Sequence, residues 1–256
     1  MKLSIVFPCK DQTAKLVHNL TSVVLKFFDF SSIDYEILIV SDGSDEANQN
    51  ALVKAVKDLP SKVKLVSYQD KKGKGHNVKR GIEEASGDFV LFMDTDLATD
   101  LKTIYKMLPL TKDYPVIIAS RHLPDSVIEG KQGFLRTLMG KVSRFIIRHK
   151  FHLEDLTDTQ CGFKLIRTDV AKLLASRQII DGFAFDVEYL YMARLNNIPI
   201  KEVSTVWTDD PDSSISHPLK TSLRFMKELN KIKRHKKAYY LTEDEKKALE
   251  GAPHVN

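Results

Sequence analysis

The sequence predicts an α/β fold with a mainly parallel central sheet flanked by helices. Short runs rich in β-branched residues alternate with amphipathic stretches along residues 1–120. These runs are too apolar for a sheet with one exposed face, so we expect helices on both faces. Polar motifs follow the ends of several runs. Because ligands of open parallel sheets bind at the carboxyl ends of the strands, these motifs are the first candidates for a binding site.

The elements follow one another in a regular order. The expected strands in the first half are residues 2–7, 35–40, 63–68, 89–93 and 116–119, because each is a short apolar run. The expected helices between them, with amphipathic spacing, are 12–28, 47–59, 75–85 and 101–110. Further on, the pattern predicts a helix over 134–149, a strand over 163–166, a helix over 185–195 and a strand over 200–206. Without an internal repeat or a Gly/Ser linker, we expect one domain over 1–215 and a basic helical extension over 216–256.

Composition indicates a folded protein that is soluble or peripheral to a membrane. Hydrophobic residues make up 43% and charged residues 29% of the 256 positions, which is enough apolar sequence for a full core. No stretch approaches the ~20 apolar residues of a membrane span. The two cysteines, Cys9 and Cys161, form no CxxC pair. The sequence therefore suggests neither a zinc site nor a disulfide framework, and it fits a reducing, cytoplasmic compartment.

The formal net charge of +5 is unevenly distributed. Residues 121–150 contain seven Lys or Arg against two Asp or Glu, and residues 219–240 contain eight against one, so the rest of the chain is net acidic. Two local basic segments indicate contact with an anionic ligand or surface. A nucleic-acid partner is disfavoured, because the body is acidic and aromatic residues are not interleaved at stacking positions.

Asp94 and Asp96 follow the fourth expected strand with one threonine between them. Side chains at i and i+2 of an extended segment point the same way, so the two carboxylates can hold one divalent cation, directly or through its water. Carboxylate oxygens suit Mg²⁺ or Mn²⁺, and such an ion can bridge to a diphosphate. The alternative is capping of the next helix. Thr99 can cap that helix unaided, which leaves the two aspartates available for a cation.

Two further motifs carry groups that can bind a nucleotide. The carboxylate of Asp42, in Ser-Asp-Gly-Ser after the second expected strand, can accept hydrogen bonds from a uracil or a ribose, and an ordinary Asp-Gly turn is the alternative. The segment KKGKGHNVKRG at 71–81 places glycines and Lys74 before a helix, where they can bind a phosphate. A flexible basic turn is its alternative. The segment is not a Walker A loop, because no GK[ST] follows.

The order of the motifs resembles the family 2 glycosyltransferases with the GT-A fold. The segments that carry the resemblance span about residues 1–214 and are SIVFPCKD, EILIVSDGSDE, GKGHNVKRG, GDFVLFMDTDLAT, SRH, DTQCGFKLIRTDVA and GFAFDVEYLYMAR. More narrowly, the sequence is similar to the glucosyl-type dolichyl- and polyprenyl-phosphate sugar synthases. The resemblance implies a nucleotide-sugar donor, UDP-linked in the first place, at Pro8 and Asp42, and a metal with the diphosphate at Asp94 and Asp96. It also implies a nucleotide-sugar-binding half at 1–120 and an acceptor half at 121–215.

The resemblance implies acceptor-side residues in the second half. DTQCGFKLI places Asp158, Gln160 and Gly162 near the reaction centre. Arg121, in the Ser-Arg pair, would lie near phosphate oxygens, which its planar guanidinium suits. One departure from the family pattern follows Trp207, where Asp212 occupies a position that is frequently glycine.

Asp186 and Glu188 stand where family members have an acidic residue beside the donor sugar. A carboxylate there binds sugar hydroxyls or acts as a general base in an inverting transfer. A phosphate acceptor is already anionic and needs little deprotonation, so Asp186 would then position the substrate rather than act as a base. The alternative is that either carboxylate pairs with Arg194 on the same helix.

Two segments have the pattern of helices at an anionic membrane surface. In 133–150 one apolar stripe lies among basic residues, and it consists of Phe134, Leu135, Leu138, Met139, Val142, Phe145 and Ile146. In 219–240 a second contact is expected from Leu223, Phe225, Met226, Leu229 and Ile232. A helix packed on the body with a solvated basic face is the alternative. Many relatives continue into transmembrane helices, whereas this sequence does not, so we expect a peripheral protein on the cytoplasmic face.

The sequence predicts a metal-dependent inverting glycosyltransferase that moves a hexose from a nucleotide sugar to a polyprenyl or dolichyl monophosphate. Two alternatives stay open. One is transfer to a hydroxyl of a polysaccharide or glycolipid, and the other is a catalytically silent sugar-nucleotide or membrane-binding protein. A nucleotidyltransferase is disfavoured, because it would need a glycine-rich activation loop near the amino terminus and the segment FPCKDQTAK contains no glycine.

Overall fold

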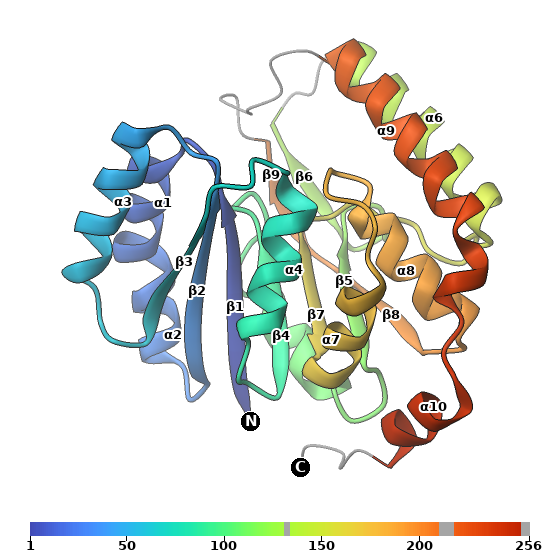
Figure 1. Ribbon diagram of the computed structural model, residues 1–256, viewed down its shortest axis with the longest axis horizontal. Helices are drawn as coiled ribbons and strands as arrows, with labels where there is room; N and C mark the ends of the chain where they lie inside the picture. Colours follow the sequence, from blue (N-terminus) through green and yellow to red (C-terminus); the bar gives the residue numbers. More distant parts are fainter. Residues whose placement is uncertain (131–133, 210–217, 252–256) are drawn as a thin grey trace.

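The computed structural model describes the backbone of residues 1–130, 134–209 and 218–251 and, within these, all side chains except those of 134–136, 218–220 and 250. Its main feature is a seven-stranded sheet of order β3-β2-β1-β4-β7-β5-β8 (Figure 1). These strands are β1 Lys2–Cys9, β2 Asp34–Asp42, β3 Val63–Tyr68, β4 Phe89–Met93, β5 Val116–Ser120, β7 Phe163–Arg167 and β8 Ile200–Ser204. Only β7 runs antiparallel to its neighbours, so the expected mainly parallel sheet is confirmed.

Helices cover both faces of this sheet and bury two apolar cores. One face carries α1 Thr13–Asn19, a π-helical turn η1 Leu20–Val24, α2 Leu25–Phe30, α3 Glu46–Lys57 and α5 Thr103–Met107 with the 3-10 turn η2 Leu108–Leu110. The other carries α4 Lys74–Glu84, α7 Thr168–Arg177 and α8 Phe185–Leu195. Outside α8 lie α6 Phe134–Phe151, α9 Pro218–Arg234, the 3-10 turn η3 Lys236–Tyr239 and α10 Glu243–Glu250. Strand residues alternate between the two cores, which explains why nearly every position in β1, β2 and β4 is buried.

Two details differ from the sequence-based expectation. Helix α7 follows β7 without a spacer and was not expected. The expected strand 200–206 divides at Thr205, where the chain leaves the large sheet to form β9 Val206–Thr208 against β6 Val127–Glu129. The Thr205 hydroxyl lies 2.6 Å from that of Thr103, and its carbonyl accepts from the Val127 amide at 2.9 Å, which fixes this division.

The helix cap assigned to Thr99 is wrong. Helix α5 begins only at Thr103, with Lys102 at its N-cap position. Thr99 instead forms an isolated bridge with Trp207, and its hydroxyl lies 3.6 Å from the Cys161 sulfur. The intervening turn is closed by Asp100, whose carboxylate accepts the Lys102 amide. Neither Asp94 nor Asp96 is at this helix start, so the capping alternative for the acidic pair also fails.

The second basic segment does not present the apolar surface that the sequence suggested. In α9, Phe225, Leu229 and Ile232 are buried in the core shared with α8, and among the described apolar side chains of this helix only Leu223 is strongly exposed. The prediction that these three side chains face a membrane is therefore wrong, because they complete the core under the outer helices. Leu219 and the expected domain boundary at 215/216, like Asp212, lie outside the described residues or side chains.

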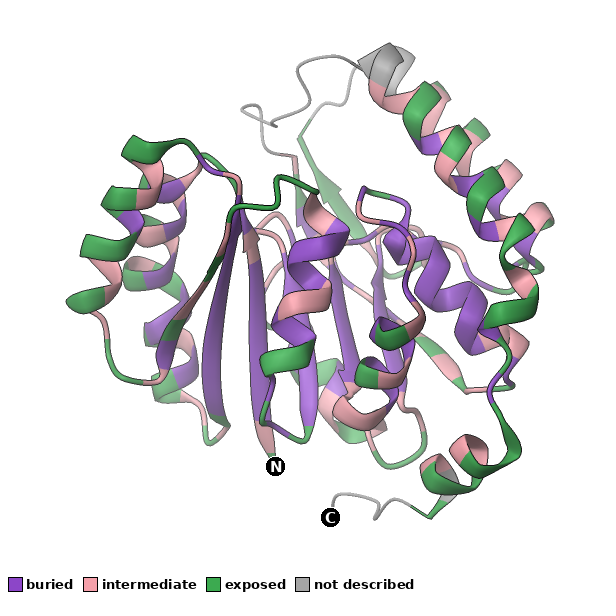
Figure 2. Ribbon diagram, viewed as in Figure 1, coloured by how far each residue is buried: buried purple, intermediate pink, exposed green. Residues whose placement is uncertain are grey.

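Helix α6 does present an exposed apolar face. Leu138, Val142 and Phe145 are 46%, 51% and 64% exposed and follow one another at helical spacing, whereas Ile147 and Phe151 are buried on the inner side. Figure 2 shows exposed and partly exposed positions along the outer side of α6 and α9, in contrast to the buried strands. The side chains of Phe134 and Leu135 lie outside the described set. Within the described residues, no helix is long and apolar enough to cross a membrane.

Candidate active site

The sheet topology brings the sequence-predicted motifs to one edge. β1, β2, β4 and β5 are parallel, so the residues that follow them emerge at the same end of the sheet. β7 is antiparallel to β4, and its first residue, Phe163, pairs with Met93 at the end of β4. The loop before β7 therefore lies beside the loop after β4. This single antiparallel strand joins the two halves of the candidate site.

Asp94 lies at the centre of this edge. The Lys74 ammonium lies 2.5 Å from its Oδ1 and comes from the first residue of α4. Gly162 packs against the same carboxylate, and a Cβ at this position would clash with Oδ2 of Asp94. A larger residue at this position would displace the Asp94 carboxylate from its present place. The structure thus brings together Lys74, Asp94 and Gly162, three residues singled out in the sequence.

Lys74 is held by several carboxylates. Its burial alone would lower the pKa of the ammonium, but Asp94, Asp186 and Asp96 outweigh burial, and the pKa is raised. Asp96 also accepts a hydrogen bond at 3.1 Å from the amide of Ala98, which fixes the turn after β4. The described residues contain no group of three or more His, Cys, Asp or Glu that could hold a metal. A cation at Asp94 and Asp96 would therefore need further ligands from a bound donor or water.

Asp158 and Arg121 form a buried pair. The Arg121 Nε and Nη2 donate to the two carboxylate oxygens at 2.6 and 2.9 Å, and the Arg121 backbone amide donates at 3.1 Å. Burial would raise the pKa of Asp158, but the guanidinium outweighs it, and the pKa lies well below the ordinary value. The Arg121 guanidinium also lies 5.4 Å from the Trp207 ring centroid. Arg121 and Asp158, which the resemblance placed near the reacting groups, therefore form an ion pair with each other.

Asp186 lies at the start of α8 and pairs with a lysine that sequence reasoning missed. The Lys164 Nζ lies 2.5 Å from Asp186 Oδ1 and donates to the Cys161 carbonyl at 2.6 Å. Both side chains are buried. Burial raises the pKa of Asp186, and Lys164 and Lys74 oppose that rise. One feature of the sequence could have indicated this pair, namely the lysine within the apolar strand FKLIR. A strand in a sheet covered on both faces is buried, and a buried charge needs a partner of opposite charge.

The structure does not bring Glu188 to this cluster. Its carboxylate accepts hydrogen bonds from the amides of Ile179 and Ile180 and from the Tyr239 hydroxyl, at 2.9, 3.1 and 2.6 Å. Burial raises its pKa, and the Tyr239 hydroxyl opposes the rise. Two residues after Asp186 on a helix, Glu188 faces away from it. The alternative pairing with Arg194 is absent too, because Arg194 bonds Asp155.

The other predicted residues lie at the rim. Asp42 is buried, and its two oxygens accept the amides of Lys71 and Lys72 at 2.8 Å each, so that it fixes the loop before α4. Pro8 is partly buried near the end of β1, level with Val40 of β2. Gln160 is partly buried, and its backbone amide donates to Asp158 at 3.2 Å.

A further basic group that sequence reasoning missed lies on the β5 side of the site. Arg144 Nη1 of α6 lies 2.6 Å from Nε2 of His122, next to Arg121. Burial lowers the pKa of His122, Asp158 opposes this, and Arg144 and Arg121 lower the pKa further, which favours the neutral imidazole whose Nε2 can accept this hydrogen bond. Within the described part of the chain no carboxylate forms an ion pair with Arg144. This corner of the site therefore favours an anion.

The sheet order, with an acidic loop after its central strand, defines a GT-A glycosyltransferase fold. A crystal structure of glucosyl-3-phosphoglycerate synthase from Mycobacterium tuberculosis with Mn²⁺, UDP-glucose and glycerol 3-phosphate shares this fold. It superposes with a TM-score of 0.64 at 14% identity, over 90% of this chain and 79% of that one.

The sequence comparison gives the family. The model of glycosyl transferase family 2 matches residues 4–174. The dolichyl-phosphate beta-glucosyltransferase of Dictyostelium discoideum is 31% identical over 90% of this chain and 73% of its own length. The enzyme of the same name from Drosophila melanogaster is 32% identical over 84% and 70%. The chain belongs to glycosyl transferase family 2 and is a hexosyltransferase, as the motif order predicted.

Proposed function

We propose that this enzyme transfers glucose from UDP-glucose to a polyprenyl or dolichyl monophosphate, with inversion at the anomeric carbon. The observation that carries the proposal is the convergence of Lys74–Asp94, Arg121–Asp158 and Lys164–Asp186 at the carboxyl edge of the sheet. The names of the relatives from Dictyostelium and Drosophila support the lipid-phosphate acceptor and the glucose. The UDP-glucose in the mycobacterial structure supports the donor.

The donor site is assigned to the loops after β1, β2 and β4 and the start of α4. Asp42 orders the 71–72 loop, which leaves Lys74 at the amino end of α4, where its ammonium and the backbone amides favour a diphosphate. Pro8 lies near the end of β1, beside β2, where it would contact the nucleoside. In this arrangement Asp42 acts chiefly on the loop, with its remaining lone pairs available to a ribose or a base.

The acidic loop fits a Mg²⁺ or Mn²⁺ ion. Asp94 and Asp96 supply hard oxygen donors, and the Asp94 side chain is 37% exposed, so it is accessible to a ligand. The ammonium of Lys74 lies 2.5 Å from Oδ1 of Asp94, which supports a site for positive charge at this carboxylate. When bound, the ion would neutralise charge on the departing diphosphate.

The acceptor phosphate is assigned to the basic corner formed by Arg121, Arg144 and His122. A phosphate oxygen there would attack the anomeric carbon as the bond from that carbon to the UDP oxygen breaks, which releases UDP. The phosphate is anionic at neutral pH and needs no strong base. Asp186, held by Lys164, would then orient sugar hydroxyls. The exposed apolar face of α6 lies on the helix that carries Arg144, so the same helix can meet an anionic membrane surface.

A transfer assay tests the proposal. The full chain is incubated with radiolabelled UDP- and GDP-sugars, vesicles containing a short polyprenyl phosphate, and Mn²⁺ or a chelator. We expect a chloroform-soluble product from UDP-glucose that disappears with the chelator. UDP release without labelled lipid would move the acceptor to a hydroxyl, for which buried Asp186 with its raised pKa would be the candidate base. Donor binding with neither hydrolysis nor transfer would indicate a silent binding protein.

A further inference from the structure

The loop between α7 and α8, residues 178–184, lies between the start of α4 and the C-terminal helix α9 (Figure 1). On the α4 side it meets the glycines of the donor segment backbone to backbone. The His76 amide donates to the Asp181 carbonyl at 3.2 Å. A Cβ at Gly73 would lie 2.7 Å from that same oxygen, and a Cβ at Gly75 would lie 2.7 Å from the Ile180 carbonyl. At Gly73 and Gly75 the two backbones therefore approach each other directly, without a side chain from the donor segment between them.

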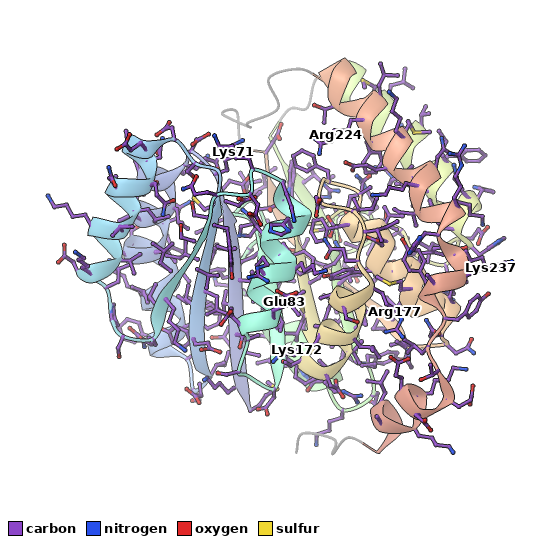
Figure 3. All side chains as sticks on the ribbon, viewed as in Figure 1. Lys71, Glu83, Lys172, Arg177, Arg224 and Lys237 are labelled. Atoms are coloured by element: carbon purple, nitrogen blue, oxygen red, sulfur yellow. The ribbon has the colours of Figure 1, made fainter. Side chains whose placement is uncertain are left out.

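The C-terminal extension holds the loop from the opposite side. The Glu228 carboxylate of α9 accepts the Ala184 amide at 3.2 Å and packs so closely on Gly182 that a Cβ there would clash with it. One turn further along α9, Lys231 Nζ donates to the Ile179 carbonyl at 2.9 Å. Figure 3 shows Arg224, the ion-pair partner of Glu228, at the same end of the molecule as Lys71, which precedes α4.

Tyr239 holds the loop through a buried carboxylate. Its hydroxyl donates to Glu188 at 2.6 Å, and the same carboxylate accepts the amides of Ile179 and Ile180. Tyr239 and Glu188 are fully buried. The two amides at the start of the loop are therefore fixed by a carboxylate that the extension itself orients. The backbone of the loop has little freedom to move, because both of its ends are hydrogen-bonded to α8 or to the extension.

We propose that Glu228, Lys231 and Tyr239 are positioning residues that hold the Gly73–Gly75 segment in place through the 178–184 loop. The consequence for catalysis rests on the proposed donor site at this segment. Close-packed interiors transmit displacement, so a shift of Ile180 or Asp181 moves the segment that carries Lys74. Lys74 lies only 2.5 Å from Asp94, and a small movement there changes how the donor diphosphate would be bound.

Two conservative variants of the full chain test this inference. Glu228→Gln replaces a carboxylate acceptor by an amide of the same shape, and Tyr239→Phe removes one hydroxyl. Asn230→Ala is the matched control, because Asn230 is exposed on the same helix and bonds Lys150 of α6 rather than the loop. Hydrogen exchange of the amides in 71–78 is measured by mass spectrometry without nucleotide, and the Kd for UDP is measured by calorimetry with Mg²⁺. Thermal unfolding of each variant is recorded alongside.

We expect exchange in 71–78 to become faster by about tenfold in both variants, and the Kd for UDP to rise by a similar factor, because Glu228→Gln removes the charge from one hydrogen bond and Tyr239→Phe removes another hydrogen bond altogether. The KM for the donor should rise with kcat little changed, and Asn230→Ala should leave all these quantities at the wild-type value. Faster exchange confined to 178–184 and 228–239, with 71–78 unchanged, overturns the inference. So does an unchanged UDP affinity in both variants. If the wild type binds no UDP but exchange in 71–78 responds, the donor assignment fails and the positioning role stands.

Discussion

At the scale of a single residue, Lys164 combines complete burial with a charge. Its ammonium and the Asp186 carboxylate neutralise each other at 2.5 Å, so removal of one partner leaves a buried charge uncompensated. We expect Lys164→Met to lower the free energy of unfolding by roughly 3 kcal/mol and to abolish transfer. Chemical denaturation and an assay with the labelled donor measure the two effects.

The double variant Lys164→Met/Asp186→Asn separates folding from function. It removes both charges, so we expect most of the lost stability to return while transfer stays absent. If transfer returns as well, Asp186 has no part in the reaction. If the single variant is as stable as the wild type, the buried pair does not contribute as its geometry indicates.

Asp96 gives a second prediction at this scale. Its carboxylate acts on Lys74 together with Asp94, and Asn would remove one hard, charged oxygen from the proposed cation site. We expect Asp96→Asn to abolish transfer and to remove the Mg²⁺ dependence of UDP binding, measured by calorimetry with and without a chelator. Asp100→Asn is the control, because Asp100 lies in the same loop and only closes a turn with Lys102. Near-normal transfer by Asp96→Asn would refute the metal assignment.

At the scale of an element, helix α6 has two sets of apolar side chains, one exposed on its outer face and one buried on its inner face. Replacing Leu138, Val142 and Phe145 by Ser should release the protein from anionic vesicles in a sedimentation assay and leave the melting temperature nearly unchanged, since these side chains are 46–64% exposed. Ile147→Ser is the contrasting variant, because Ile147 is buried and its loss should cost about 2–4 kcal/mol of stability. Vesicle binding that survives the triple substitution would place the membrane contact elsewhere.

Near the amino ends of the strands, away from the candidate site, one buried carboxylate links three strands by hydrogen bonds. Glu36 of β2 accepts hydrogen bonds from Ser4 of β1, from Lys64 of β3 and from Ser86 before β4. Burial would raise its pKa, but these hydrogen bonds outweigh burial and lower it to about 2.

Because the pKa of Glu36 is lower in the folded state than in the unfolded state, the ionised carboxylate stabilises the fold above pH ~4.5, and this contribution disappears as pH falls towards 2. We expect Glu36→Gln to be roughly 2 kcal/mol less stable than the wild type at pH 7 and nearly equal to it near pH 2. Urea denaturation across this range measures the difference. A difference that does not change with pH would mean that packing, not ionisation, carries the effect.

At the scale of the whole molecule, the C-terminal extension belongs to the core. Among its described residues, the buried hydrophobic side chains are Phe225, Leu229, Ile232, Tyr239 and Leu241. At about 2 kcal/mol for each, their burial is comparable to the entire net stability of a typical domain. We expect a chain that ends at residue 209 to lose cooperative thermal unfolding, measured by circular dichroism. Retention of a sharp transition would show that the extension is an appendage, as the sequence suggested.

The local elements were predictable because their signals are local. Strands 63–68 and 89–93 and helix 185–195 have the predicted bounds, since each is a periodic apolar run with clear ends. Asp94 was named because it follows the carboxyl end of a parallel strand, and Lys74 because it lies among glycines at the start of a helix. By contrast, Lys164, Arg144 and Tyr239 are distant in sequence from the groups they bond, and no local pattern indicates such a partner.

The sequence by itself determined the fold class, the glycosyltransferase family and the acidic loop after β4, because periodicity and motif order are carried by neighbouring residues. Only the tertiary structure decided which carboxylates share a site. Asp186 and Glu188 are two residues apart, yet the helix turns one towards Lys164 and the other towards Tyr239. Likewise, equally apolar stripes on α6 and α9 differ in exposure because α9 packs its stripe on α8. Burial and pairing depend on contacts between distant segments, and those contacts exist only once the chain is folded.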